Sequence, residues 1–309
     1  MPGLTLPHDY HVHTRFSMDS QMSMEDACRE AIRLGLPQIC FTEHVDFVPG
    51  DEGVGFFDPG AYFEELNRCR DLFGDKLLVR AGAEIGEAHR FSADARELAD
   101  SYPFDFIIGS LHWVGEDLVM DPSYFDGKSR DESYEAYFAE LLALVKHGGF
   151  DVVGHLDVPK RYDLEALGQF DATRYAEQIR AVLRACVETG ICIEVNTGSM
   201  RRTGGDPSPS PVVLRWYREL GGEVLTFGSD AHRPAHLAFA FDQAREWALQ
   251  AGFTRLASFD RRQLSFVPIA YASMFGNSGS LIPLSVLAAI ALSGSALLAE
   301  TAGCWHFRP

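Results

Sequence analysis

The sequence predicts an α/β protein whose parallel strands close into a barrel. Short runs of apolar and β-branched residues alternate with amphipathic stretches that carry helix-capping residues, and this alternation repeats across residues 4–267. Parallel strands need a connection of helical length, so strict alternation of strands and helices favours a parallel sheet. Seven such repeats favour a barrel over an open sheet.

The seven predicted strands are short and apolar, and turn-forming residues separate them from the helices. They are residues 10–13, 38–42, 77–85, 106–111, 151–156, 191–196 and 223–229. Ser23 and Asp26 form a capping box before the predicted helix 27–34, and Gly35 ends it. Three further helices are expected: one begins at Asp58 and ends at Gly74, one begins at Asp171 and ends at Gly190, and one begins at Ser210 and ends at Gly221.

The net charge, the cysteine spacing and the N-terminal residues argue against several classes of protein. The chain has 309 residues, and 44 Asp and Glu against 27 Lys and Arg give a net charge of −17, which disfavours binding to nucleic acid. The six cysteines form no C-x-x-C pair, so we expect reduced thiols rather than a disulfide framework. Residues 1–10 lack the pattern of a secretory signal. We therefore expect a cytoplasmic protein.

Metal-binding residue types follow almost every predicted strand. In a barrel of parallel strands, the active-site residues lie at the strands' C-terminal ends. The residues found there are His11, His13, Glu43, His44, Glu84, His112, His155, Asn196, Asp230 and His232. His11 and His13 are two apart, so both side chains point to one face of the strand, and Asp230 and His232 share this spacing. Imidazoles with carboxylates suit zinc, manganese or iron, and their number predicts a cluster with a bridging carboxylate.

The same residues carry a resemblance to a known family. The motifs are His11-Val12-His13-Thr14 with Ser17 and Asp19, Thr42-Glu43-His44, Gly82-Ala83-Glu84, Gly109-Ser110-Leu111-His112, Gly154-His155-Leu156-Asp157 and Gly228-Ser229-Asp230-Ala231-His232. In this order, over about residues 8–268, they resemble the PHP (polymerase and histidinol phosphatase) superfamily. The segment 194–201 and the pair Lys160-Arg161 resemble its monofunctional histidinol-phosphate phosphatase branch.

The resemblance implies a distorted seven-stranded (β/α) TIM-like barrel that holds three divalent metal ions, zinc, manganese or iron. It implies three sets of ligands: His11, His13, Glu84 and Asp230; Glu84, His112 and His155; and Asp19, His44 and His232. Asp19 stands where other members of the superfamily place a histidine, and an oxygen ligand there favours manganese or magnesium. The identity of the metal stays open.

The implied reaction is hydrolysis of a phosphate monoester, histidinol phosphate, in histidine biosynthesis. Arg161 and Arg201 are expected to bind the phosphate, with Lys160 and Arg202 as neighbouring alternatives. Asn196 is expected to contact the substrate as well. Asp230, His232 or a water molecule of the cluster would protonate the leaving alkoxide. The alternatives are another PHP phosphoesterase or nuclease, or a metal-binding protein without catalysis.

Two segments lack a clear assignment. Residues 114–133 show no periodicity, so we expect a long loop in which Tyr124 or Phe125 covers the substrate or, alternatively, an acidic solvated loop. Residues 263–299 carry no charged side chain, and 281–299 is long enough to cross a bilayer. Pro283 and Gly294 speak against a membrane anchor, which is not favoured. We predict a barrel over residues 1–270 and an apolar extension over 271–309 that packs on it, mediates oligomers or is nonnative.

Overall fold

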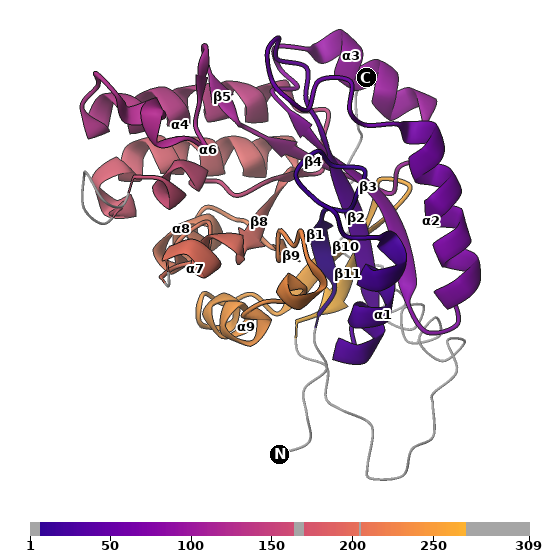
Figure 1. Ribbon diagram of the computed structural model, residues 1–309. Helices are drawn as coiled ribbons and strands as arrows, with labels where there is room; N and C mark the ends of the chain where they lie inside the picture. Colours follow the sequence, from indigo (N-terminus) through magenta and orange to yellow (C-terminus); the bar gives the residue numbers. More distant parts are fainter. Residues whose placement is uncertain (1–6, 164–169, 204, 270–309) are drawn as a thin grey trace. The chain divides into compact units, whose positions relative to one another are not determined.

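The fold is seen in a computed structural model that describes residues 7–163, 170–203 and 205–269 (Figure 1). The extension 271–309, with its expected membrane or oligomer contacts, lies outside these residues. No helix within the described ranges is long and apolar enough to cross a membrane.

One nine-stranded sheet forms the centre of the fold. Its order is β1 (Asp9–Val12), β2 (Gln38–Val45), β3 (Leu78–Gly86), β4 (Phe106–Ser110), β7 (Val152–Val153), β8 (Cys192–Asn196), β9 (Leu225–Gly228), β10 (Arg255–Asp260) and β11 (Gln263–Pro268). The first eight strands are parallel, and β11 runs antiparallel to β10. All seven predicted strands are present in the predicted order. The hairpin of β10 and β11 was not predicted.

Helices cover the outside of the sheet (Figure 1). They are α1 (Met24–Leu34), α2 (Pro59–Phe73), α3 (Ser92–Ser101), α4 (Arg130–His147), α6 (Ala176–Thr189), α7 (Gly198–Thr203), α8 (Pro211–Glu219) and α9 (Phe241–Gln250). The predicted caps of the first helix are confirmed, because the Ser23 side chain accepts a hydrogen bond from the Asp26 amide and Gly35 has a φ of 77°. The helix expected from Asp171 begins as a 3₁₀ turn, Ala172–Tyr175, and continues as α6.

The segment 114–133 is not the structureless loop that we expected. It contains a short hairpin of β5 (Trp113–Val114) and β6 (Asp117–Leu118), a 3₁₀ turn at Pro122–Phe125, and the start of α4. Tyr124 is buried, and its hydroxyl donates to the backbone oxygen of Ser133 (2.6 Å). This placement makes Tyr124 part of the core and does not favour the predicted contact with substrate.

The predicted closed barrel is not confirmed, because within the described residues the sheet does not close. Val12 and Ala231 form only an isolated bridge, in which the His13 amide donates to Ala231 (2.9 Å) and the Asp230 amide donates to His11 (2.8 Å). The sheet nevertheless curves strongly. One buried cluster combines Val224, which precedes β9, with side chains from six strands: Tyr10, Cys40, Phe106, Ile108, Val152, Cys192, Ala257 and Phe259.

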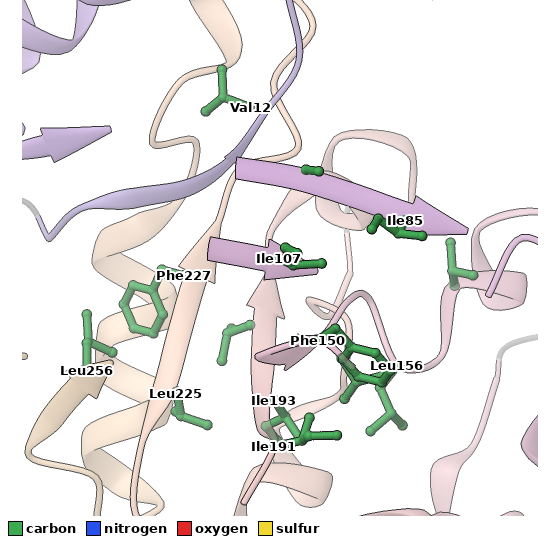
Figure 2. Close-up of a cluster of buried hydrophobic side chains, with 14 of the residues drawn as sticks. Val12, Ile85, Ile107, Phe150, Leu156, Ile191, Ile193, Leu225, Phe227 and Leu256 are labelled. Carbon is green, nitrogen blue, oxygen red and sulfur yellow. The ribbon is translucent and has the colours of Figure 1, made fainter. Parts of the chain in front are cut away.

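A larger apolar core lies between the sheet and the helices. Figure 2 shows part of it, with side chains of β3, β4, β8, β9 and β10 beside one another. The C-terminal ends of the parallel strands differ, because buried polar residues gather there, among them His11, His13, Glu84 and Asp230. The fold therefore concentrates polar chemistry at this one end.

The hairpin of β10 and β11 is fastened to the rest of the sheet by Asp105. One carboxylate oxygen of Asp105 accepts from the Arg261 amide (3.0 Å), and the other accepts from the Ala81 amide (2.9 Å) and the Arg70 guanidinium (2.8 Å). The backbone oxygen of Asp105 accepts from the Arg262 amide (2.9 Å). The turn residues Arg261 and Arg262 have φ angles of 47° and 63°, as a tight two-residue hairpin turn requires.

We expect Asp105→Ala to lower the free energy of unfolding by about 3 kcal/mol, because two backbone amides and the Arg70 guanidinium lose a buried acceptor. Urea denaturation of the full chain measures this difference. Asp71→Ala, on the exposed surface of α2, is the control and should change stability by less than about 0.5 kcal/mol. Equal stability of the two variants would show that Asp105 does not fasten the hairpin.

Candidate metal centre

The Glu84 carboxylate, near the end of β3, lies at the centre of the predicted cluster. It is fully buried, and imidazole nitrogens approach both of its oxygens. Oε2 is 3.2 Å from His11 Nε2, 3.4 Å from His13 Nε2 and 3.1 Å from His44 Nδ1, whereas Oε1 is 3.4 Å from His112 Nε2 and 2.9 Å from His155 Nε2. Glu84 thus faces two groups of histidines, as a bridging carboxylate would.

The remaining predicted ligands border the same group. Asp230 Oδ1 lies 3.6 Å from His13 Nε2, and Asp19 Oδ2 lies 2.9 Å from His232 Nε2. Asp19 is also 3.7 Å from His44 Nε2, and its side chain is 47% exposed. The structure therefore brings all nine predicted ligands together, with Asp19 and His232 on the accessible side.

Four groups of side chains are compact enough to hold a metal ion in the described part of the chain. They are His13, His44 and His232; His11, His13 and Asp230; His11, Glu84 and His155; and His44, Asp46 and His112. These groups share members, and they divide the histidines differently from the three predicted sets. They also include Asp46, which the sequence analysis did not select. The signal for Asp46 was available, because it follows His44 at the same two-residue spacing as His11 and His13.

Hydrogen bonds decide which ring nitrogen of two histidines faces the centre. His11 Nδ1 lies 2.7 Å from a Glu194 carboxylate oxygen, and His232 Nδ1 lies 3.0 Å from the backbone oxygen of Asp230. Both partners accept hydrogen bonds, so each Nδ1 carries the hydrogen and each Nε2 keeps a lone pair. The Nε2 atoms of His11 and His232 are buried and have no hydrogen-bond partner, and Glu84 Oε2 has none either. Buried lone pairs that converge in this way suit a divalent cation.

The electrostatic field of the site favours positive charge. Burial alone would lower the pKa of His44, but the Glu84 and Asp19 carboxylates outweigh burial and raise this pKa to about 9. Burial alone would raise the pKa of Asp230, but Arg161 and His11 hold it well below its ordinary value. The carboxylates therefore stay ionised, and cations and protons compete for the same imidazoles.

Glycines allow the side chains of the site to approach one another. A Cβ on Gly228 would lie 2.5 Å from His11 Cβ and would overlap Glu194. A Cβ on Gly198 would lie 2.9 Å from Asp230 Cβ. Asp230 itself has a φ of 56°, an uncommon backbone conformation for a residue other than glycine, and such strain is often found at functional sites.

Two of the predicted phosphate-binding residues border Asp230. Arg161 donates to Asp230 Oδ2 and to Asn196 Oδ1, both at 2.8 Å, and its Nε has no partner. Arg201 donates to the backbone oxygens of Ser229 (2.5 Å) and Asp230 (2.7 Å). Asn196 is fully buried, so it positions Arg161 from within the fold.

Lys160 and Arg202 are placed differently. The Lys160 ammonium is buried and donates to Asp157 (3.0 Å) and to the backbone oxygen of Pro207 (2.5 Å). Arg202 is exposed, and its guanidinium lies 4.8 Å from the centre of the Tyr162 ring. These contacts do not favour a phosphate contact by Lys160, and its predicted role in substrate binding stays a prediction.

Comparison with known proteins shows which family this chain belongs to. The family described as "PHP domain" matches residues 9–198 of the chain. The chain belongs to the PHP family. The PHP relatives include the histidinol-phosphatase of Lactococcus lactis, which is 33% identical over 81% of this chain and 93% of the relative. A probable histidinol-phosphatase of Clostridium acetobutylicum is 32% identical over 78% of this chain and 92% of the relative.

A solved PHP structure is similar over almost its whole length. It is the histidinol phosphate phosphatase of Lactococcus lactis in complex with zinc, L-histidinol and phosphate. The two structures share 30% sequence identity and a TM-score of 0.76, and the match covers 84% of this chain and 98% of that one. The PHP assignment made from the sequence motifs is thus confirmed.

We expect Glu84→Gln to weaken zinc binding by at least about 100-fold, because the change removes the negative charge between two groups of histidines. Zinc content after dialysis, measured by elemental analysis, and competition with a chromophoric chelator both report this loss. Glu64→Gln, on the exposed surface of α2, is the matched control. Zinc affinity that is the same in both variants would contradict a central role for Glu84.

Proposed function

We propose that this chain is a metal-dependent histidinol-phosphatase, which converts L-histidinol phosphate and water to L-histidinol and phosphate. The observation that carries the proposal is the similarity to a histidinol phosphate phosphatase that binds zinc, L-histidinol and phosphate, over 98% of that structure. The cluster of imidazoles and carboxylates at the strand ends supports it, because this donor set suits the ion in the relative.

The proposed cofactors are three divalent ions, zinc, manganese or iron. They would be held by the three ligand sets that the resemblance implies, two of which share Glu84. Bound divalent ions lower the pKa of water and neutralise charge that develops on phosphoryl oxygens. We propose that the finer barrel description applies as well, with the bridge between Val12 and Ala231 as the point of closure.

The protein's own residues would orient the phosphate. Arg161 retains a buried Nε without a partner, and a guanidinium can hold two oxygens of a phosphate at once. Arg201 is fixed by two backbone oxygens next to Asp230 and would add positive charge beside the same group. Both arginines would stabilise charge on the oxygens that do not take part in bond cleavage.

Two side chains are candidates for protonating the leaving alkoxide. His232 is 23% exposed, and its Nε2 lies 2.9 Å from Asp19. Asp230 is ionised and therefore cannot donate unless it first accepts a proton. His232 Nε2 carries a lone pair when Nδ1 donates to the Asp230 backbone oxygen, so His232 must also accept a proton first. The choice between these two side chains and a water molecule stays open.

The proposed catalytic unit is residues 1–270. All nine predicted ligands lie between His11 and His232, within the nine-stranded fold. The partner is a small phosphate monoester, and a cytoplasmic location stays a prediction. A PHP nuclease is less favoured than a phosphatase, because a net charge of −17 repels a nucleic-acid backbone.

Zinc-loaded protein should release phosphate from L-histidinol phosphate, and treatment with a chelator should abolish the release until a divalent metal is restored. A colorimetric phosphate assay measures this, with glycerol phosphate and a nucleoside monophosphate as comparison substrates. Folded, metal-loaded protein that leaves L-histidinol phosphate intact would refute the proposed function. Preference for glycerol phosphate or the nucleotide would favour another PHP phosphoesterase.

Arg161→Lys should lower kcat/KM for L-histidinol phosphate roughly 100-fold, since lysine cannot make the two-pronged contact of a guanidinium. Arg202→Lys should leave kcat/KM within about threefold, because Arg202 lies over Tyr162 on the surface. Steady-state kinetics on both variants, with zinc content measured in parallel, make the comparison. The opposite ranking would assign phosphate binding to Arg202.

A further inference from the structure

We propose that Glu43 acts through Ser17 to determine which ring nitrogen of His13 faces the metal centre. Glu43 precedes His44 on β2 but takes no part in the cluster around Glu84, and the mechanism above does not use it. The inference rests on the proposed metal centre, and it assigns Glu43 and Ser17 as positioning residues for His13.

The Ser17 hydroxyl has three partners, which together use all of its hydrogen-bonding capacity. Ser17 Oγ lies 2.7 Å from Glu43 Oε2, 2.9 Å from the His44 amide nitrogen and 3.1 Å from His13 Nδ1. A hydroxyl group carries one hydrogen and two lone pairs. The backbone amide of His44 can only donate, so it occupies one lone pair.

The Glu43 carboxylate fixes the direction of the remaining two bonds. Glu43 is fully buried, and besides Ser17 it accepts from the Thr14 amide (2.8 Å) and the Thr14 hydroxyl (2.6 Å). An ionised carboxylate only accepts, so the single hydrogen of Ser17 must point to Glu43. The last lone pair of Ser17 must therefore accept a hydrogen from His13 Nδ1.

This assignment leaves His13 Nε2 with a lone pair. The Nε2 atom is buried without a hydrogen-bond partner, and it lies 3.4 Å from Glu84 Oε2 and 3.6 Å from Asp230 Oδ1. The His13 ring is stacked against His44 and His232, with centroids 4.2 Å and 4.4 Å away. Stacking on both sides holds the plane of the ring, and Ser17 holds the position of its hydrogen.

Ser17→Ala and Glu43→Ala should each weaken zinc binding by roughly 10-fold to 100-fold, the usual effect of losing a residue that orients a metal-binding histidine. Glu43→Gln should stay within about threefold of the unchanged chain. Its amide oxygen can accept from Ser17 and the Thr14 amide, while its amide nitrogen can donate to the Thr14 hydroxyl. Conservation of zinc binding in Glu43→Gln would show that an acceptor, rather than a charge, is what Ser17 needs.

The matched control is Ser20→Ala. Ser20 is a buried serine of the same loop, but its hydroxyl contacts the backbone oxygens of His13 and His232 and no ring nitrogen. Zinc affinity is measured on the full chain by competition with a chromophoric chelator, and Tm is measured with zinc and with chelator. We expect Ser20→Ala to lower both Tm values equally, and Ser17→Ala to shrink the increase in Tm that zinc produces.

Zinc affinity in Ser17→Ala equal to that in Ser20→Ala would overturn the inference and leave Ser17 a structural role. Equal losses in Glu43→Gln and Glu43→Ala would also overturn it. These measurements do not depend on turnover. If the unchanged chain binds zinc but releases no phosphate, the proposed function fails while the inference about His13 stands.

Discussion

The structure depends on one buried carboxylate. Glu84 is surrounded by five imidazole nitrogens at distances up to 3.4 Å, and water does not reach it. An ionised group buried in this way costs several kcal/mol unless opposite charge compensates it. The hydrogen bond to Glu194 leaves the Nε2 lone pair of His11 directed at Glu84, so this ring compensates the charge best by sharing a cation with Glu84.

This arrangement is possible because the two ends of the sheet carry different kinds of side chain. Near the N-terminal ends of β1 and β4, Tyr10 and Phe106 pack with Phe259 of β10, and Asp105 holds the hairpin of β10 and β11 in place. At the opposite ends the metal-binding side chains gather, and loops connect the strands to the helices. The bridge between Val12 and Ala231 brings the ends of β1 and β9 together, and with them His11, His13 and Asp230. A site that needs ligands from six strands therefore requires the curvature of the whole sheet.

Much of this could be predicted from the sequence, because strand alternation and metal-binding side chains are local signals. The order of the seven strands and eight of the nine clustered ligands follow from residue type and position, whereas Asp19 was selected from the resemblance to the PHP superfamily. Asp46 was missed although its spacing from His44 was informative. The hairpin of β10 and β11 was missed because most of β11 is exposed and lacks an apolar run. The hydrogen bond of Tyr124 to Ser133 spans nine residues and that of Lys160 to Pro207 spans 47, and neither contact is encoded in a local sequence pattern.

The central claim is that Glu84 bridges metal ions through both of its oxygens. A crystal structure of the zinc-loaded chain, with anomalous scattering recorded on both sides of the zinc absorption edge, tests this most directly. The account predicts zinc peaks at about 2.0–2.2 Å from each Glu84 oxygen, with His11 or His13 beside one and His155 beside the other. Zinc peaks that do not contact Glu84, or no peak at the strand ends, would contradict it.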